Sequence, residues 1–258
     1  LFKEILKKNS SIISDKEIPQ FPLLKKIAKR KSLKLLDIGK EIEKIKDFYS
    51  LSENNFKIKN LAMAISAVKL CGLKEKLAYG VIKKIKDVNG RLELIRTFSN
   101  NIRVFIDYAH TPDALLKTLE ILKINYGKNI SLVFGCGGER DKKKRPLMAR
   151  IADENCKKIY ITDDNPRNEN PKKIRNELLK NIKGNKGFNI GNRLLAIKKA
   201  IQNANPQEII LVAGKGHEEH QVYKDKIYNI YDKKIIKKIS LKTKIISKKE
   251  RNYIQNKL

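Results

Sequence analysis

Short apolar runs alternate with amphipathic stretches through the second half of the chain. The apolar runs are uninterrupted, as in strands that are buried on both faces of a sheet. In the stretches between them, apolar residues recur every three or four positions, the period of a helix with one buried face. We expect strands at residues 104–106, 132–134, 159–161 and 209–213, and helices from Pro112 onward and at 146–155, 171–182 and 193–203. This alternation predicts an α/β fold with a mostly parallel sheet and helices on both faces.

The pattern is less regular on either side of this region. Residues 221–232 are expected to form a terminal hairpin before a last short helix. In the first hundred residues, the spacing of apolar positions predicts helices at 23–36, 60–71 and 75–85 and a strand at 42–50. Gly90 then interrupts the pattern, so we expect a domain boundary between about residues 91 and 100.

Each expected strand of the second half ends in polar or glycine-rich residues. The segments that follow the four strands are residues 107–112, 135–141, 163–167 and 214–220. Because the carboxyl ends of parallel strands meet at one edge of a sheet, we expect these segments to form a ligand site together. Simpler interpretations stay open: Thr111 can cap the helix that begins at Pro112, and the glycines can form a plain turn.

The segment after the third strand carries both signs of charge within five residues, DDNPR. Arg167 can pair with a carboxylate, and Asp164 can accept hydrogen bonds from an ammonium group. Arg140 and Glu218, from neighbouring segments, extend the same charge pattern. We therefore expect one socket for an amino acid with zwitterionic ends; the alternative is an ordinary charged turn on the surface.

Several other chemistries are disfavoured by the sequence. The chain contains no GxxxxGK[ST] phosphate-binding loop, so it is not a self-contained P-loop enzyme. His217 and His220 do not form an HExxH zinc motif, and the three cysteines form no CxxC pair, so we expect no metal ligated by the chain itself. Unpaired cysteines of this kind are typical of a reducing, cytoplasmic compartment.

The chain is strongly basic, with 258 residues and a formal net charge of +30. Such a charge leaves open a non-catalytic domain that binds nucleic acid through phosphate contacts. Only 11 of the 58 basic residues are arginine, however, and lysine spread over solvated helix faces favours neither base reading nor specific nucleic acid binding. We interpret residues 240–258 as a basic tail. No apolar run is long enough to insert into a membrane.

Five stretches carry a resemblance to a known family: GRLEL at 90–94, DYAHTPDAL at 107–115, FGCGGERDKKKRPLM at 134–148, TDDNPR at 162–167 and LVAGKGHE at 211–218. In order and spacing they resemble the Mur ligases of peptidoglycan synthesis, and within that family the type that adds meso-diaminopimelate. The resemblance covers most of residues 55–239. It implies that diaminopimelate is bound by Arg140, Asp164, Asn165, Pro166, Arg167, Gly214 and Glu218, and that Asn60, Arg91 and Asp107 lie near the nucleotide.

The resemblance also implies a reaction. Such ligases use ATP and Mg²⁺ to form an acyl phosphate on the D-glutamate side chain of UDP-N-acetylmuramoyl-dipeptide, which the amine of diaminopimelate then attacks. The DNPR stretch disfavours the related ligases that add glutamate to folates. A cytoplasmic, monomeric protein is expected.

The resemblance divides the chain into residues 1–94, the later part of a central ATP-binding domain, residues 95–239, a Rossmann-like amino-acid-binding domain, and the tail. The family's P-loop, its carbamylated lysine and its N-terminal UDP-sugar domain have no counterpart here. We therefore expect the chain to be an N-terminally truncated form that does not turn over alone.

Overall fold

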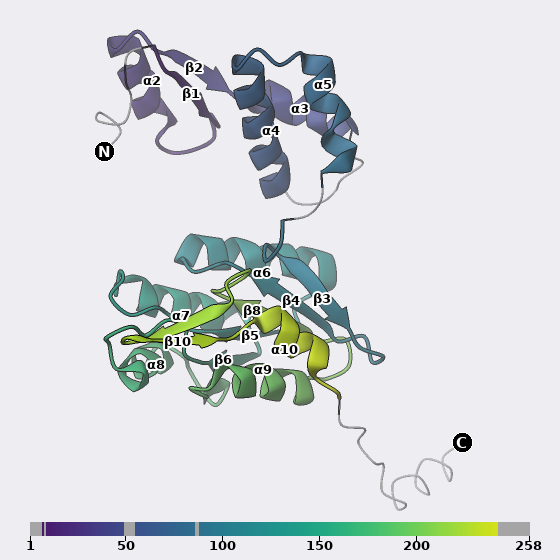
Figure 1. Cartoon of the computed structure of the whole chain (residues 1–258), viewed down its shortest axis with the longest axis vertical. Helices are drawn as coiled ribbons and strands as arrows, with labels where there is room; N and C mark the ends of the chain where they lie inside the picture. The colour runs from purple at the N-terminus through teal and green to yellow at the C-terminus, as the bar shows by residue number, and fades with distance from the viewer. Residues whose placement is uncertain (1–6, 8, 49–54, 86–87, 242–258) are drawn as a thin grey trace, which may run out of the picture. The chain divides into compact units, whose positions relative to one another are not determined.

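The computed structural model describes residues 7, 9–48, 55–85 and 88–241, and the chain separates into two compact units at Lys86 and Asp87 (Figure 1). This division lies a few residues before the boundary expected at 91–100. The reason is that Glu93–Thr97 is not a linker but strand β3, paired with a strand of the second unit. The tail expected at 240–258 lies outside the described residues beyond 241.

The first unit is a small α/β unit. Strand β1 (Ser11–Ser14) pairs in parallel with β2 (Lys34–Asp37), and α2 (Phe21–Arg30) connects them. The remaining helices of this unit are α3 (Gly39–Phe48), α4 (Asn55–Leu70), α5 (Glu75–Gly80) and the 3-10 helix η1 (Ile82–Lys84). Their buried residues form one apolar cluster that includes Ile38, Ile45, Ile58 and Ile82. Packing of these amphipathic faces, rather than helix propensity alone, holds such short helices together.

Two predictions for this unit are wrong. Residues 42–50 were expected to form a strand, but they lie largely in α3, because Ile38, Ile42 and Ile45 face the core at helical spacing. The helix expected at 23–36 ends at Arg30, and residues 34–37 instead pair with β1. The turn between them contains Ser32 with a positive φ of 51°, which breaks the helix. The helices expected at 60–71 and 75–85 are present as α4, α5 and η1.

The second unit is built on a six-stranded sheet in the order β3-β4-β8-β5-β6-β7. All neighbouring strands are parallel except the edge strand β3, which runs antiparallel to β4. The parallel strands are β4 (Arg103–Asp107), β5 (Ile130–Phe134), β6 (Lys158–Ile161), β7 (Gly187–Asn189) and β8 (Ile209–Ala213). All four predicted strands are therefore confirmed, and β3 and β7 are additional.

Helices cover both faces of this sheet (Figure 1). Leu132 and Phe134 face α6 (Pro112–Tyr126), α7 (Lys144–Asn155) and α8 (Pro171–Leu179), whereas Val133 packs with α9 (Arg193–Gln202) and α10 (Asp232–Lys238). This alternation follows from the two-residue period of a strand. The predicted α/β fold with a mostly parallel sheet is confirmed.

The expected terminal hairpin is present. Strands β9 (His220–Tyr223) and β10 (Lys226–Asn229) pair antiparallel and precede α10. Within the described part of the chain, no helix is long and apolar enough to cross a membrane.

Candidate functional site

The loops after β5 and β6 touch through their backbones at the carboxyl edge of the sheet, and the loop after β8 approaches a side chain of the loop after β6. A Cβ atom added to Gly135 would lie 2.2 Å from the carbonyl oxygen of Thr162, and one on Gly138 would lie 1.9 Å from that of Pro166. A Cβ atom added to Gly214, which has φ +105°, would lie 3.0 Å from the side-chain Oδ2 atom of Asp164. The glycines are therefore needed for loop-to-loop contact, which goes beyond the plain turn that the sequence left open.

Arg167 anchors the loop after β6 to its neighbours. Its backbone N–H donates to the carbonyl of Val222 (3.0 Å) and its carbonyl accepts from the N–H of Lys224 (2.8 Å), which docks the hairpin on this loop. Its Nη1 atom donates to the carbonyl oxygens of Gly138 (2.8 Å) and Asn165 (3.3 Å). No partner of its Nε or Nη2 is found among the described residues, so the half-buried guanidinium keeps donors for a carboxylate.

Asn165 connects the three loops. Its Oδ1 atom accepts from the Nζ of Lys215 (3.1 Å) and from the N–H of Val222 (3.0 Å). Its Nδ2 atom donates to Oε2 of Glu218 (3.3 Å), and its backbone carbonyl accepts from the N–H of Gly138 (2.9 Å). The side chain and backbone of one residue thus tie Glu218, on the loop after β8, to the loop that carries Arg167.

The two adjacent aspartates have different roles. Asp163 is buried, forms an ion pair with Arg175, and accepts a hydrogen bond from the hydroxyl of Tyr223 (2.9 Å). Asp164 is half-buried, and its Oδ1 atom caps the N–H of Asn165 (2.7 Å). Its Oδ2 atom has no hydrogen-bond partner within the described residues. Of the two carboxylates, Asp164 is therefore the one that can receive a ligand's ammonium group.

Glu218 is held ionised at the same edge. Burial raises its pKa, but the ammonium of Lys215 and hydrogen bonds from Asn165 and Tyr108 lower it more, so the pKa lies below the ordinary value for a glutamate. The side chain is 35% exposed, which leaves it accessible to a ligand. Gly214 and Pro166, two other predicted residues, contribute backbone contacts that bring the loops together.

Arg140 lies on the loop after β5, and it is exposed and has no ion pair within the described residues. Its Cγ atom and the Nη1 of Arg167 both flank Gly137, at 3.8 Å and 3.0 Å from a Cβ placed there. The two predicted arginines therefore converge on one glycine, although they come from different loops.

A second group of predicted residues lies at the end of β4. Asp107 is buried, and its carboxylate accepts from the N–H groups of Leu92 (2.5 Å) and Ala109 (2.7 Å). Burial raises its pKa. The exposed Arg91 stacks over the ring of Tyr108, with 4.3 Å from its Cζ to the ring centroid. Thr111 caps α6 by accepting from the N–H of Ala114, as the simpler interpretation predicted.

Asn60 belongs to the first unit, where it is exposed on α4. Its expected place near the nucleotide stays a prediction, as do the binding roles of the other residues.

The sequence of the second unit matches the family of the Mur ligase glutamate ligase domain over residues 90–216. These residues contain β3 to β8, the loops after β5 and β6, and the first residues of the loop after β8. The chain carries the C-terminal domain of a Mur ligase.

Proteins similar to this Mur ligase domain are named for one activity. The chain is 44% identical over 190 residues to the UDP-N-acetylmuramoyl-L-alanyl-D-glutamate–2,6-diaminopimelate ligase of Wigglesworthia glossinidia brevipalpis, covering 73% of this chain and 38% of that protein. It is 35% identical over 261 residues to the Rickettsia typhi ligase of the same name, covering 92% of this chain and 52% of the relative. A solved structure of such a ligase superposes with a TM-score of 0.55 at 33% identity, covering 72% of this chain and 38% of the other. The chain therefore spans between about a third and a half of the length of these relatives.

Sequence reasoning missed the burial of several cations of the Mur ligase domain, two of which hold the loops of the site. Lys215 and Arg145 both have wholly buried side chains. The Nη2 atom of Arg145 donates to the carbonyl of Gly137 (3.1 Å) and to both carboxylate oxygens of Glu169 (3.0 Å each), which fixes the loop after β5. In so basic a sequence, Arg145 cannot be distinguished from the exposed lysines and arginines. For Lys215, the glycines on both sides were the one available signal.

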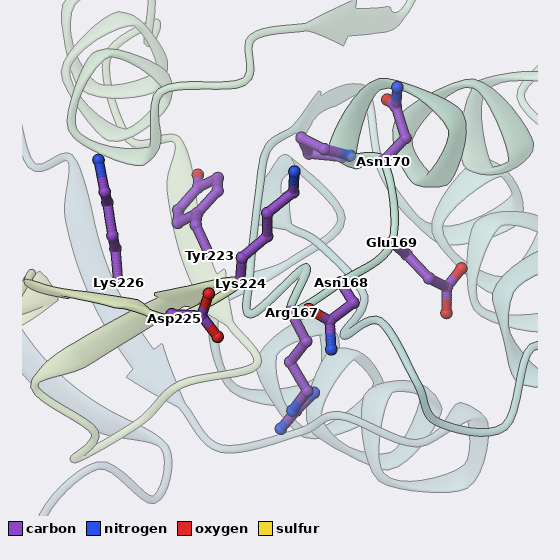
Figure 2. Close-up of a pocket in the computed structure, with 9 residues that line it drawn as sticks. Arg167, Asn168, Glu169, Asn170, Tyr223, Lys224, Asp225 and Lys226 are labelled. Atoms are coloured by element: carbon purple, nitrogen blue, oxygen red, sulfur yellow. The ribbon is translucent and has the colours of Figure 1, made fainter.

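A cavity of about 560 Å³ lies beside the DNPR loop, lined by residues 167–171 and 223–226. Figure 2 shows that the side chain of Arg167 points in the opposite direction to those of Tyr223 and Lys224. Arg167 is the only predicted site residue in its lining. Hydrogen bonds thus join Asp164, Arg167 and Glu218 through Asn165, and this cavity is not a common socket for the predicted residues.

Among the described residues, no group of three or more His, Cys, Asp or Glu side chains could hold a metal ion.

Proposed function

We propose that this chain is the diaminopimelate-binding part of an ATP-dependent ligase that adds meso-diaminopimelate to UDP-N-acetylmuramoyl-L-alanyl-D-glutamate. The observation that carries the proposal is the position of Asn165, whose amide contacts Glu218 and whose carbonyl contacts Arg167. One short loop thereby links an acceptor for an ammonium group to a donor for a carboxylate. The names of the relatives point to the same ligand.

The proposed ligand has two zwitterionic ends, and the charges of the site suit one of them. Asp164 and Glu218 accept hydrogen bonds from an ammonium group, while Arg167 and Arg140 pair with a carboxylate. Pro166 stiffens the turn between Asn165 and Arg167 because its φ angle is fixed. Binding through one end leaves the other amine free to react, which is the positional requirement for forming an amide bond at a single nitrogen.

The proposed reaction requires activation of the carboxylate that the amine attacks. ATP with Mg²⁺ supplies this activation when bound, by converting the D-glutamate side-chain carboxylate into an acyl phosphate. Asn60, Arg91 and Asp107 are proposed to lie near the nucleotide, and the exposed guanidinium of Arg91 over Tyr108 suits contact with an anionic ligand. The described residues contain no phosphate-binding loop of the P-loop type, so the full reaction is proposed for the complete ligase.

Calorimetric titration of the chain with meso-diaminopimelate tests the proposal. We expect saturable binding that Arg167→Ala weakens by at least about tenfold, because a charge-assisted carboxylate contact contributes roughly 1.5–3 kcal/mol. Lys199→Ala removes one positive charge from an exposed position on α9 and serves as the matched control.

L-lysine provides the discriminating ligand, since it lacks the second carboxylate. The unaltered chain should prefer diaminopimelate over lysine, and Arg167→Ala should reduce that preference. Absence of binding by a folded chain, or equal affinity for the two amino acids, would contradict the proposed function.

A further inference from the structure

Lys215 places a charged group in the interior of the candidate site. Its side chain is wholly buried, although a lysine ammonium is costly to remove from water unless it is paired. The Nζ atom donates to Oε2 of Glu218 and to Oδ1 of Asn165, both at 3.1 Å. The Nδ2 atom of Asn165 completes a closed ring by donating to the same Glu218 oxygen at 3.3 Å.

This ring determines which way the Asn165 amide faces. Both Lys215 and the N–H of Val222 point donors at one side of the amide, so that side must be the oxygen. The Nδ2 group then faces Glu218. If the amide flipped, its NH2 group would face the ammonium of Lys215, and two donors would lie opposite each other. The orientation of a predicted ligand-binding residue therefore depends on Lys215.

The charge around Glu218 depends on Lys215 as well. The charged and titratable groups that face Glu218 are Lys215 on its own loop, Tyr108 after β4 and Arg193 on α9. Arg193 is already paired with a carboxylate, that of Asp232. Lys215 is thus the cation that offsets the burial of Glu218.

We propose that Lys215 is a positioning residue for the amino-acid ligand: its buried ammonium holds the Glu218 carboxylate and the Asn165 amide in the arrangement that receives the ligand's amino group. The inference rests on the proposed function for the identity of the ligand. It adds a residue to which the resemblance assigns no role and a pairwise dependence that can be measured.

A double-variant cycle tests this dependence. Calorimetry with meso-diaminopimelate is performed on the unaltered chain, Lys215→Met, Glu218→Gln and the double variant, with Lys199→Met as control and thermal unfolding to verify folding. Lys215→Met should weaken binding by at least roughly tenfold, as expected when one partner of a buried charge pair is removed. In the Glu218→Gln background the same change should cause a much smaller loss, because the two residues act as one unit.

The pH dependence separates positioning from simple loosening of the loop. Without Lys215, the half-buried carboxylate of Glu218 loses its cation, its pKa rises, and binding is lost at a higher pH as the solution is acidified. A variant that only loosened the loop would weaken binding by the same factor at every pH. The Lys199→Met control should keep the profile of the unaltered chain.

The outcomes distinguish the two proposals. No binding by the unaltered chain overturns the proposed function, whereas unchanged affinity and pH profile in a folded Lys215→Met variant overturn the present inference alone. Should Lys215→Met not fold, NMR titration of the Glu218 carboxyl carbon in the unaltered chain takes its place. A carboxyl pKa at or above the ordinary glutamate value of about 4.3 would then contradict the inference.

Discussion

Gly138 lies so close to Pro166 that a Cβ atom on Gly138 would come within 1.9 Å of the proline's carbonyl oxygen. The contact joins the loop after β5 to the DNPR loop through backbone atoms alone. Because the obstacle is the backbone carbonyl of Pro166, moving a side chain aside does not make room for a methyl group on Gly138. The relative position of Arg140 and Arg167 therefore depends on a residue without a side chain.

Gly138→Ala should displace the DNPR loop. We expect a destabilisation of about 1–3 kcal/mol, the usual cost of forcing an extra carbon into a packed site, together with weaker binding of diaminopimelate. Urea unfolding and calorimetry measure the two effects. Gly80→Ala is the matched control, because a Cβ atom at Gly80 meets nothing within 4 Å. Unchanged stability and affinity in Gly138→Ala would show that the loops are not in contact.

Breaking the buried ion pair between Arg193 and Asp232 should strongly lower the free energy of unfolding of the second unit. Both side chains are wholly buried, and the guanidinium binds the carboxylate through Nε (2.8 Å) and Nη2 (2.7 Å). Asp232→Asn leaves the guanidinium uncompensated, which typically costs about 3–5 kcal/mol. Thermal unfolding should show a markedly lower Tm, whereas Asp225→Asn in the exposed hairpin turn should leave the Tm nearly unchanged. Equal Tm values for the two variants would contradict this assignment.

Glu169 should make stability fall on acidification. Burial raises the pKa of Glu169, but hydrogen bonds from the N–H of Glu139 and the guanidinium of Arg145 lower it by more. The folded-state pKa is therefore below the unfolded value. A lowered carboxyl pKa contributes stability that is present above the unfolded pKa, near 4.5, and is lost as the pH falls through the folded value. Glu169→Gln should therefore reduce stability at pH 7 and flatten its decline below about pH 5.

Urea unfolding between pH 3 and pH 7 measures this effect. Glu154→Gln, at an exposed position on α7, is the control. A Glu169→Gln variant whose stability declines with acid as steeply as that of the unaltered chain would rule out the proposed linkage.

The three cysteines should differ sharply in reactivity. Burial raises the pKa of Cys136 and of Cys156 to about 12, so neither forms the reactive thiolate at neutral pH, whereas Cys71 is exposed. A thiol reagent at pH 7.5 should label Cys71 rapidly and the other two only after unfolding. Mass spectrometry of the labelled peptides measures the difference. Rapid labelling of Cys136 in the folded chain would show that the loop after β5 opens.

The sequence was sufficient for the parts of the fold where hydrophobic period and burial agree. Strands such as β5 and β8 are buried on both faces, so their apolar runs are uninterrupted and easily recognised. The strand β7 has only three residues and includes a glycine and an asparagine, so it gave no such signal. The sequence of helix α3 does not show a clear helical period, because few of its residues are apolar. The period becomes evident only when Ile38, which precedes the helix, is counted with it.

The site was predictable at the level of loops but not of individual partners. The rule that parallel strands present their carboxyl ends at one edge placed Arg167 and Glu218 close together before any contact was known. It could not show that Asp163 is occupied by Arg175 and Tyr223 while Asp164 is available. Nor could it show that Lys215 is buried, because burial of one lysine among many is decided by the packing of distant segments.

The peptide bond between Asn165 and Pro166 protects the residue that joins the three loops. Asparagine side chains deamidate when the nitrogen of the next residue attacks the amide carbon, but a proline nitrogen carries no hydrogen and is a poor nucleophile for that cyclisation. Deamidation would convert the Nδ2 donor into a second acceptor facing Glu218 and place two negative charges side by side. With proline in the next position, the donor that Glu218 needs is chemically durable over the lifetime of the protein.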